Sequence, residues 1–518
     1  MNRPDLPRNI NLASWFVDQP AEKYADRIAI LEEDRSLTYR ALQSLVNRAG
    51  NSLRRLGCAP GDRVVIRLPD GVAFAAAFFG ALKIGAIPVP ISPLGKISEY
   101  ISCMNDSGAR YAITSDLDSA SAGAPRRSDV QVITLDEETG TITRTPWTQA
   151  FSESSPALDP VPADGRSPAL FLYTSGSTGK PKAAVHAHHS LMHANYNVGQ
   201  GVFQIGQEDR MLSLTRLFFS LGLACGLYFP LFAGGSTVLN SEPNDPRTVA
   251  SLINKYRPTI LVAVPSILAA LEKAARNWLE IDWSSLRFIA TGGEPLPPGL
   301  FERFKSGIGV EILEGLGSTE MINNILSNRP GEGRSGTCGR EVPGVEIELR
   351  DENGAPVEDG KIGTLYVKSP TALLEYWNKP AETARIRAGE WITLGDKMYR
   401  DPDGFFHFCG RNDDMLKIAG EWVVPGVVEA VILKHPDVDY AIVTAREDKQ
   451  GIKRLVAYIA PKGSREVTAG DLTRFVSERV QPYMVPSIFV VLAELPRTPT
   501  GKVDRQLLPR PEWPEPSN

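Results

Sequence analysis

Short apolar runs alternate with helical stretches along most of this chain, and this alternation constrains its fold more than any other feature. The run Thr259–Val264 resembles a buried strand stopped by Pro265, and Ser266–Ala275 then has helical periodicity. Two further apolar runs, Leu286–Ala290 and Val310–Leu313, follow with a helical stretch between them. Such alternation is typical of layered domains with largely parallel sheets, so we predict an α/β fold.

A change in the pattern of apolar and turn residues predicts a second domain. From about Gly344 the apolar runs become shorter and rich in turn residues, which is typical of a β-rich subdomain. After Arg411 the pattern is that of an α+β unit of about a hundred residues, a normal size for a small domain. Because 518 residues exceed one typical core, we predict a large N-terminal domain over residues 1–411 and a small mobile domain over residues 412–518.

Composition argues against several classes of function. With 56 basic and 61 acidic residues the net charge is −5, and no basic tail indicates a nucleic-acid partner. The N-terminal residues lack the apolar core of a signal peptide, and the apolar stretch Phe74–Leu82 is too short to span a bilayer. The five cysteines are scattered without a C-x-x-C pair, as is usual in a reducing compartment. We expect a cytoplasmic protein without membrane contact.

The sequence Tyr173–Lys182, YTSGSTGKPK, has the composition of a phosphate-binding loop. It connects the apolar runs Ala169–Tyr173 and Ala183–Val185, which we predict to be strands. Glycines expose backbone N–H groups, hydroxyl groups donate further hydrogen bonds, and lysines supply positive charge. The residues expected to hold a nucleotide are Thr174, Ser175, Gly176, Ser177, Thr178, Gly179, Lys180 and Lys182.

This loop differs from a Walker A motif. Gly176 and Gly179 are three residues apart, and Pro181 disfavours a helix directly after Lys180. The pattern closely resembles the signature loop of the adenylate-forming superfamily, which comprises acyl- and aryl-CoA ligases, amino-acid adenylation domains and luciferases. The resemblance covers essentially the whole chain, with all sequence blocks of that superfamily in order.

Two glycine turns follow predicted strands, at the end where α/β sheets bind ligands. Gly315–Glu320, GLGSTE, resembles the block in which Thr319 hydrogen-bonds the α-phosphate as a catalytic group and Glu320 helps to hold Mg²⁺. On its own, this block is equally compatible with a turn and a glutamate at a helix start. The second turn resembles the loop that packs on the adenine face, which implies nucleotide contacts by Gly292, Gly293, Glu294 and Pro295.

Two further blocks resemble the ribose site of the superfamily. Asp396 matches the aspartate of a T-G-D block, with Leu394 in place of the usual threonine or serine, and Arg411 matches the arginine of G-R-x-D. The resemblance implies that Asp396 accepts hydrogen bonds from the ribose hydroxyl groups. It also implies that Arg411 contacts the ribose or a phosphate, with Phe408 in the same nucleotide-binding set.

The C-terminal blocks imply a catalytic lysine and a hinge. Pro496–Lys502, PRTPTGK, resembles the block whose lysine, here Lys502, reaches the α-phosphate and the substrate carboxylate. By the same resemblance, the hinge and the CoA-binding region comprise Asp413, Lys417 and Gly420.

Within the superfamily, the chain is most similar to the benzoate-CoA ligase group. Leu221 stands where benzoate ligases commonly have tyrosine, and Asn323 and Asn324 replace apolar or histidine side chains. A smaller apolar wall with extra amide groups predicts room for a ring substituent, as in a 2-amino- or hydroxybenzoate. Anthranilate is the specific expectation, with benzoate as an alternative. The aryl pocket is expected to comprise Phe219, Leu221, Gly222, Thr291, Gly315, Gly317, Asn323 and Asn324.

The resemblance implies an acid–thiol ligase that uses ATP, Mg²⁺ and CoA. The carboxylate would attack the α-phosphorus of ATP to give aryl-AMP, and CoA would displace AMP after the small domain rotates about Asp413. One alternative is an aryl-AMP ligase that loads an acyl carrier protein, and another is a non-catalytic nucleotide-binding protein. The oligomeric state is left open, with a homodimer among the alternatives.

Overall fold

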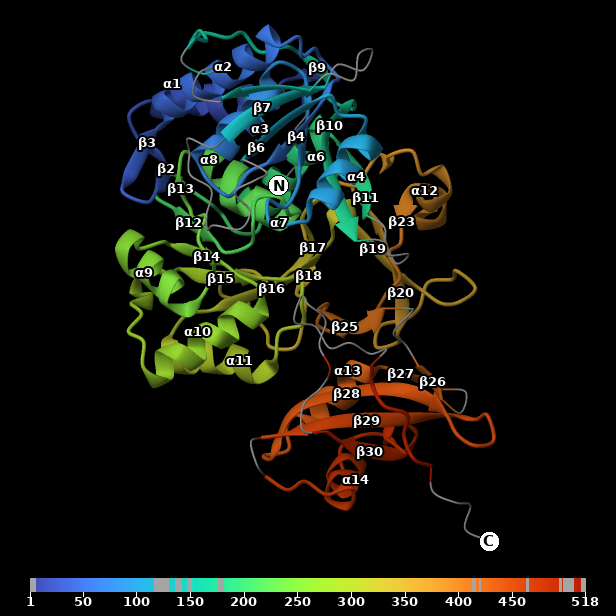
Figure 1. The fold of residues 1–518 in the computed structure, drawn as a ribbon. Coiled ribbons are helices and arrows are strands. Elements are labelled where there is room, and N and C mark those ends of the chain that lie inside the picture. The colour runs from blue at the N-terminus through green and yellow to red at the C-terminus, as the bar shows by residue number, and fades with distance from the viewer. Residues whose placement is uncertain are drawn as a thin grey trace. The chain divides into compact units, whose positions relative to one another are not determined.

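The computed structural model describes residues 6–115, 130–135, 142–146, 151, 153–175, 181–411, 416–418, 421–462, 465–492, 496 and 507–513. The chain divides into two compact units (Figure 1). The first comprises Met1–Ile347 and Val367–Ile392, and the second comprises Glu348–Tyr366 and Thr393–Asn518. The boundary expected after residue 411 falls at residues outside the described ones and stays a prediction.

A nine-stranded sheet in the first unit has the order β18-β17-β16-β15-β14-β12-β13-β2-β3. The central strands from β16 to β2 run parallel, and antiparallel strands stand at both edges. The carboxyl ends of β14, β15 and β16 therefore meet at one edge. The strands are β2 (Ile28–Glu32), β3 (Arg35–Thr38), β12 (Arg210–Ser213), β13 (Ser236–Leu239), β14 (Ile260–Val262), β15 (Phe288–Thr291), β16 (Ile312–Gly317), β17 (Asn324–Ser327) and β18 (Arg340–Glu341).

Helices α9, α10 and α11 lie beside β14, β15 and β16 (Figure 1). Each of these helices begins with a proline. Proline is favourable there because the N–H groups in the first turn of a helix have no partner within the helix, so the N–H that proline lacks costs no hydrogen bond. Apolar side chains of these helices and strands form one buried cluster, and the predicted strand–helix alternation is confirmed. The helices are α9 (Pro246–Tyr256), α10 (Pro265–Asn277) and α11 (Pro298–Glu302).

A five-stranded sheet in the N-terminal part has the order β5-β4-β6-β7-β8. Helices α2 and α3 contact each other where Gly80 meets Ala49 and Gly50: a Cβ on Gly80 would lie 2.6 Å from the Ala49 Cβ. Glycine at this position lets the two helices approach closely. The elements are α2 (Tyr39–Arg55), β4 (Arg63–Arg67), α3 (Val72–Lys83), β5 (Ile87–Pro90), α4 (Ile97–Ser107), β6 (Tyr111–Ser115), β7 (Val130–Leu135) and β8 (Ile142–Pro146).

A small antiparallel sheet, β10-β11-β21, contains the two strands on either side of the predicted phosphate loop. Its strands are β10 (Pro168–Ser175), β11 (Pro181–Ala187) and β21 (Glu375–Tyr376). Further α-helices and strands of the first unit are β1 (Asn9–Ile10), α1 (Gln19–Tyr24), β9 (Ala163–Asp164), α6 (His188–Ala194), α7 (Ser220–Leu223), α8 (Phe229–Ala233), α12 (Pro380–Ile386), β22 (Arg387–Ala388) and β23 (Trp391–Ile392).

Strand β20 (Gly363–Lys368) contributes residues to both units. In the first unit Val367 pairs with Ile392, and in the second Gly363 pairs with Met398. The neighbouring strands confirm the β-rich region that was predicted from about Gly344. They are β19 (Glu346–Arg350), β24 (Asp396–Arg400) and β25 (Phe406–Arg411).

The C-terminal part of the second unit has its own core. Helices α13 and α14 pack against the sheet β28-β29-β30, and their apolar residues form one buried cluster. This is the α+β unit that the sequence predicts. The elements are β26 (Leu416–Ile418), β27 (Glu421–Val423), α13 (Pro425–Ile432), β28 (Val438–Glu447), β29 (Lys453–Pro461), α14 (Ala469–Ser477) and β30 (Ile488–Val491).

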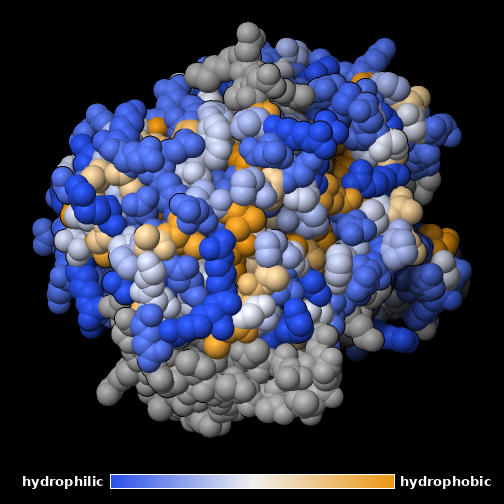
Figure 2. All heavy atoms as spheres, turned by 90° about the horizontal axis from the view of Figure 1, so that it is seen from above, coloured by the Kyte–Doolittle hydropathy of each residue, from blue (hydrophilic) through white to orange (hydrophobic). Residues whose placement is uncertain are grey.

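One face of the surface and the five cysteines give no sign of a membrane segment or a disulfide among the described residues. On the face shown in Figure 2 hydrophilic residues predominate, with short hydrophobic stretches between them. No helix among the described residues is both long and apolar enough to cross a membrane. All five cysteines are free and buried.

A buried ion pair joins η1 (Ser14–Asp18), a π-helix, to α3 in the first unit. Lys83 Nζ lies 2.6 Å from Asp18 Oδ1 and donates to Asn47 Oδ1 at 2.6 Å, and Gln43 donates to Asp18 at 2.9 Å. The Lys83 side chain is only 2% exposed. Removing one partner of such a pair leaves an uncompensated buried charge, which is strongly destabilising.

We therefore expect Lys83→Met to lower the free energy of unfolding of this unit by about 3 kcal/mol or more, measured by chemical denaturation. Arg40→Met is the control, because Arg40 pairs with Asp26 at the surface and exposed pairs contribute at most about 1 kcal/mol. Equal losses in the two variants would contradict the importance of the buried pair.

Candidate active site

Strands β10 and β11 form the hairpin that carries the predicted phosphate loop. Thr174 pairs with Lys182 and Ser175 pairs with Pro181, so the two strands converge on residues 176–180. As predicted, a strand rather than a helix follows the loop. The loop residues Gly176, Ser177, Thr178, Gly179 and Lys180 lie outside the described residues.

Thr319 and Glu320 lie in a short 3-10 turn directly after β16. Glu320 is buried, and its Oε1 accepts a hydrogen bond from the Tyr376 hydroxyl at 2.6 Å. The carbonyl oxygen of Thr319 lies 2.8 Å from Nε2 of His186 in β11. Complete burial lowers the pKa of His186 to about 4, so the ring is neutral near pH 7 and donates from Nε2. Strands β11 and β21 thus fix both predicted residues.

Glycines at the ends of β15 and β16 allow neighbouring segments to approach closely. A Cβ on Gly315 would lie 2.4 Å from Asn324 Nδ2, and one on Gly317 would lie 2.6 Å from the carbonyl oxygen of Asn323. A Cβ on Gly292 would lie 2.9 Å from the carbonyl oxygen of Gly315. The structure therefore brings these five predicted site residues together.

Asn323 is held in a strained turn. Ile322, which precedes it, has a φ of 58°, in the left-handed region that β-branched residues rarely adopt. The Asn323 side chain is buried, and its Oδ1 accepts a hydrogen bond from the Asn324 N–H at 2.7 Å. Within the described part of the chain, the amide nitrogen of Asn323 has no hydrogen-bond partner.

The predicted adenine loop is fastened at several points. The Thr291 hydroxyl donates to the Ala263 carbonyl at 2.7 Å. The Glu294 carboxylate accepts from the Ser266 N–H at 3.2 Å, so it caps the start of α10. Gly293 has a φ of 82°, which favours glycine. Adenine contacts by Gly292, Gly293, Glu294 and Pro295 stay predictions.

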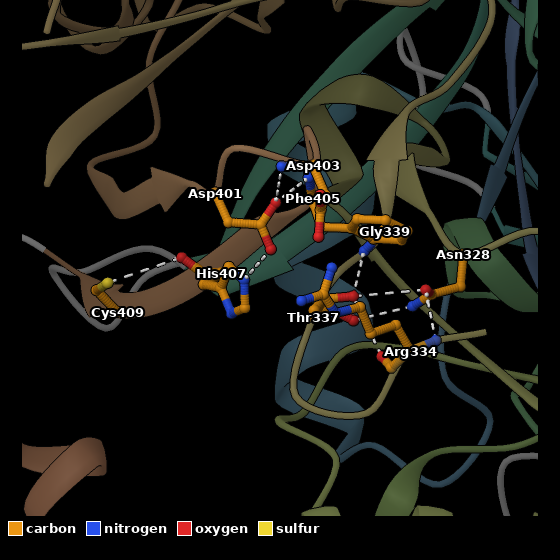
Figure 3. Close-up of polar contacts among 9 residues, drawn as sticks. All are labelled: Asn328, Arg334, Thr337, Gly339, Asp401, Asp403, Phe405, His407 and Cys409. Carbon is orange, nitrogen blue, oxygen red and sulfur yellow. Dashed lines mark hydrogen bonds and ion pairs between the residues drawn. The ribbon is translucent and has the colours of Figure 1, made fainter. Parts of the chain in front are cut away.

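Glu314 supports the predicted adenine loop, and the sequence motifs did not single it out. Its buried carboxylate accepts from the Leu296 N–H at 3.2 Å and so holds the far end of the predicted adenine loop. Asn328, shown with Thr337 in Figure 3, donates to the Glu314 carbonyl at 3.0 Å. Burial raises the pKa of Glu314 to about 7. The sequence signal for Glu314 was its position: it directly follows an apolar run and directly precedes Gly315.

The predicted aryl segment before α7 is anchored by Asp70. The buried Asp70 carboxylate accepts from the Leu217 N–H at 3.0 Å and lies 3.6 Å from Nη1 of Arg216. A Cβ on Gly222 would lie 2.1 Å from the Arg216 carbonyl oxygen, so packing requires glycine there. Phe219 is 53% exposed, and Leu221 is half-buried. Contact of these residues with an aryl group stays a prediction.

The predicted ribose residues meet on the β24–β25 hairpin of the second unit. Asp396 pairs with Arg411, whose Nε lies 3.6 Å from Asp396 Oδ1, and Phe408 pairs with Met398. Arg411 also donates to the Leu394 carbonyl at 2.8 Å. The structure thus gathers Asp396, Phe408 and Arg411 on one hairpin.

Asp401 holds the turn of this hairpin (Figure 3). Its Oδ1 accepts from the N–H groups of Asp403 and Phe405, and its Oδ2 lies 3.0 Å from His407 Nε2. Asp413, Gly420 and Lys502, which the sequence also predicts, lie outside the described residues, as does the side chain of Lys417 in β26.

Comparison with known proteins identifies the family. Residues 17–377 match the AMP-binding enzyme family, and residues 427–502 match the AMP-binding enzyme C-terminal domain. The chain belongs to this family. The predicted membership of the adenylate-forming superfamily is confirmed.

Several of the relatives are CoA ligases of aromatic acids. The chain is 35% identical over 480 residues to the benzoate–CoA ligase of Thauera aromatica, covering 92% of this chain and 91% of the relative. It is 34% identical over 465 residues to the anthranilate–CoA ligase of Pseudomonas aeruginosa, covering 86% of each chain. A crystal structure of an anthranilate CoA ligase in complex with anthranoyl-AMP matches with a TM-score of 0.85 and 30% identity over 96% of each chain. These matches confirm the predicted enzyme class, an acid–thiol ligase, and the predicted fold.

The pKa of Glu314 leads to a prediction about pH. Because this pKa is higher in the folded than in the unfolded chain, the carboxyl contributes stability below about pH 4.5 that is lost as the pH rises to about 7. Glu314→Gln cannot ionise and keeps an acceptor for the Leu296 N–H. We therefore expect the melting temperature of the variant to fall less than that of the wild type between pH 5 and pH 8.

Glu302→Gln is the control for this measurement, because Glu302 is an exposed glutamate on α11. It should follow the wild-type profile. Parallel profiles for the wild type and Glu314→Gln would show that the Glu314 carboxyl does not titrate in this range.

Proposed function

We propose that this protein is an ATP-dependent aryl-CoA ligase, which converts a benzoate-type acid to aryl-AMP and then to the CoA thioester, releasing pyrophosphate and AMP. The observation that carries the proposal is a contact between the strand that follows the first sequence block and the turn formed by the second block. Strand β11, which leads out of the phosphate loop, holds the Thr319–Glu320 turn through the bond between His186 and the Thr319 carbonyl.

The reaction needs positioning and charge stabilisation rather than a protein nucleophile, because the carboxylate of the substrate is itself the nucleophile. Backbone N–H groups and lysines of the 174–182 loop would hold the phosphates, and Thr319 would donate to the α-phosphate. Gly293, in the loop after β15, has no neighbouring heavy atom within 4 Å of where a Cβ would lie, which leaves room for a ligand beside the backbone. Lys502 would offset the charge that builds as the acyl–phosphate bond forms.

The side chains of Thr319 and Glu320 are chemically suited to binding a magnesium ion. Mg²⁺ prefers hard oxygen ligands, and the Thr319–Glu320 turn offers a carboxylate and a hydroxyl in consecutive residues. Glu320 would hold the ion, which supplies charge neutralisation at the phosphate oxygens. Tyr376 and the backbone contacts of the turn would orient the carboxylate.

Asn323 supports a substituted ring. Its Oδ1 is committed to the Asn324 N–H, and its buried amide nitrogen still lacks an acceptor among the described residues. A buried donor without a partner is costly, and the oxygen of a ring hydroxyl group could accept its hydrogen bond. This contact supports a hydroxybenzoate as substrate. A 2-aminobenzoate is the other candidate: its ring amino group is mainly a donor, so anthranilate is supported by the similarity to anthranilate–CoA ligases rather than by Asn323.

The second unit would complete the nucleotide site and then change its orientation. Asp396 would accept hydrogen bonds from the ribose hydroxyl groups, with Arg411 and Phe408 beside it on the same hairpin. A rotation about Asp413 would withdraw Lys502 and bring Lys417 and Gly420 to the CoA thiol. A cytoplasmic location stays a prediction.

A substrate panel tests the function. Benzoate, 2-aminobenzoate, three hydroxybenzoates, a cinnamate and a medium-chain fatty acid are each incubated with Mg·ATP, with and without CoA. We expect AMP and aryl-CoA with a substituted benzoate. Adenylate without thioester would indicate a carrier-protein acceptor instead of CoA, and no turnover with any acid would overturn the enzyme assignment.

Lys502→Ala should separate the two half-reactions. We expect adenylation from acid and ATP to slow about 100-fold or more, because charge stabilisation is lost, while thioester formation from supplied aryl-AMP is largely retained. Each half-reaction is measured separately by product quantification.

Lys434→Ala serves as the control, because Lys434 is an exposed lysine of the same unit. It should leave both half-reactions unchanged. An equal loss in both half-reactions of Lys502→Ala would contradict the assignment of Lys502 to adenylation.

A further inference from the structure

Tyr376 lies between the two sequence blocks of the proposed site. It is the second residue of β21, is 2% exposed, and pairs with Ala184 of β11. Its hydroxyl donates to Glu320 Oε1 at 2.6 Å. This distance is typical of a hydrogen bond from a hydroxyl group to a charged acceptor, which is stronger than one between neutral groups.

The ring of Tyr376 contacts the other block. Nζ of Lys182 lies 4.3 Å from the ring centre, within the range of a cation–π interaction. Lys182 and Ala184 point to the same face of β11, because side chains alternate along a strand. One tyrosine side chain therefore touches a cation at the end of the phosphate loop and the carboxylate proposed to hold the metal ion.

The backbone around Tyr376 is rigidly attached to both partners. The Leu373 N–H donates to the Glu320 carbonyl at 2.7 Å, and the Leu374 N–H donates to the Val185 carbonyl at 2.7 Å. The Trp377 N–H donates to the Ala183 carbonyl at 2.9 Å. The backbone on both sides of Tyr376 is therefore hydrogen-bonded to β11 and to the Thr319–Glu320 turn. These bonds fix the position of the Tyr376 hydroxyl relative to Glu320.

We propose that Tyr376 is a positioning residue for adenylation. Its hydroxyl fixes the plane of the Glu320 carboxylate, and its ring fixes the ammonium group of Lys182, so that both charges are set before the nucleotide binds. The inference rests on the proposed function, in which Glu320 holds the magnesium ion. Nothing in the sequence motifs assigns a role to this residue.

A purely structural tyrosine would behave differently. Loss of its hydroxyl would remove one buried hydrogen bond and lower stability, without changing the metal dependence of the reaction. Residues that orient a metal ligand typically change metal affinity or activity about 10- to 100-fold when they are mutated. The metal dependence therefore distinguishes the two roles.

Tyr376→Phe is the test, because phenylalanine keeps the ring near Lys182 and removes only the hydroxyl. Tyr39→Phe is the matched control: Tyr39 is 0% exposed in the same unit, and its hydroxyl donates to the Gly235 carbonyl at 2.6 Å. Three quantities are measured: the melting temperature, the Mg²⁺ dependence of acid-dependent pyrophosphate exchange, and the gain in ATP affinity on adding Mg²⁺, by calorimetry.

We expect Tyr376→Phe to raise the Mg²⁺ concentration for half-maximal exchange about tenfold or more, and to reduce the Mg²⁺-dependent gain in ATP affinity. Tyr39→Phe should leave both at wild-type values, with a similar loss in melting temperature. Wild-type metal dependence in Tyr376→Phe would overturn the inference.

Glu320→Gln separates this inference from the proposed function. If it abolishes exchange while Tyr376→Phe behaves as the wild type, Glu320 keeps its proposed role and only the positioning role of Tyr376 is lost. If it leaves exchange and its Mg²⁺ dependence intact, the role of Glu320 fails, and the inference fails with it.

Discussion

The parallel pairing of β14, β15 and β16 is the constraint on which the candidate site of the first unit depends. Because these strands run in the same direction, the segments that follow them leave the sheet at one edge. That is where the Thr291 loop, Glu314 and the Thr319–Glu320 turn come together. Gly292, Gly315 and Gly317 allow neighbouring segments to approach the backbone here more closely than any side chain would permit.

Buried polar groups connect this edge to the rest of the first unit. Glu320 is bonded to Tyr376, Glu314 to the Leu296 N–H and Asp70 to the Leu217 N–H, so each carboxylate holds a different segment of the proposed site. A buried carboxylate is costly unless it is hydrogen-bonded. The arrangement of the proposed site therefore depends on a few specific contacts. Mutation of either partner in such a contact should change the position of the segment that it holds.

The predicted site residues are divided between the two units. Thr319 and Glu320 belong to the first unit, whereas Asp396, Phe408 and Arg411 belong to the second. Each group is held by contacts within its own unit: Glu320 by the Tyr376 hydroxyl, and Arg411 by its pairing with Asp396.

Much of this protein could be read from local sequence. The strands and helices between residues 246 and 317, the hairpin around the predicted phosphate loop and the small C-terminal unit all follow from apolar periodicity, prolines and glycines, which act over a few residues. The motif residues Thr319, Glu320, Asp396 and Arg411 were recognisable for the same reason: each stands in a short block with its own spacing.

Only the tertiary structure decided which residues support these motifs. Tyr376 stands in a two-residue strand far along the chain from Glu320, and Asp70 precedes a buried helix far from Arg216, so no local pattern links either pair. Glycine was required at Gly222 and Gly315 by neighbours that fold against them. The sequence by itself determined the elements and the chemical groups, because propensity and composition are local. The partners of those groups were decided by packing between distant segments, which a single sequence does not encode in any short pattern.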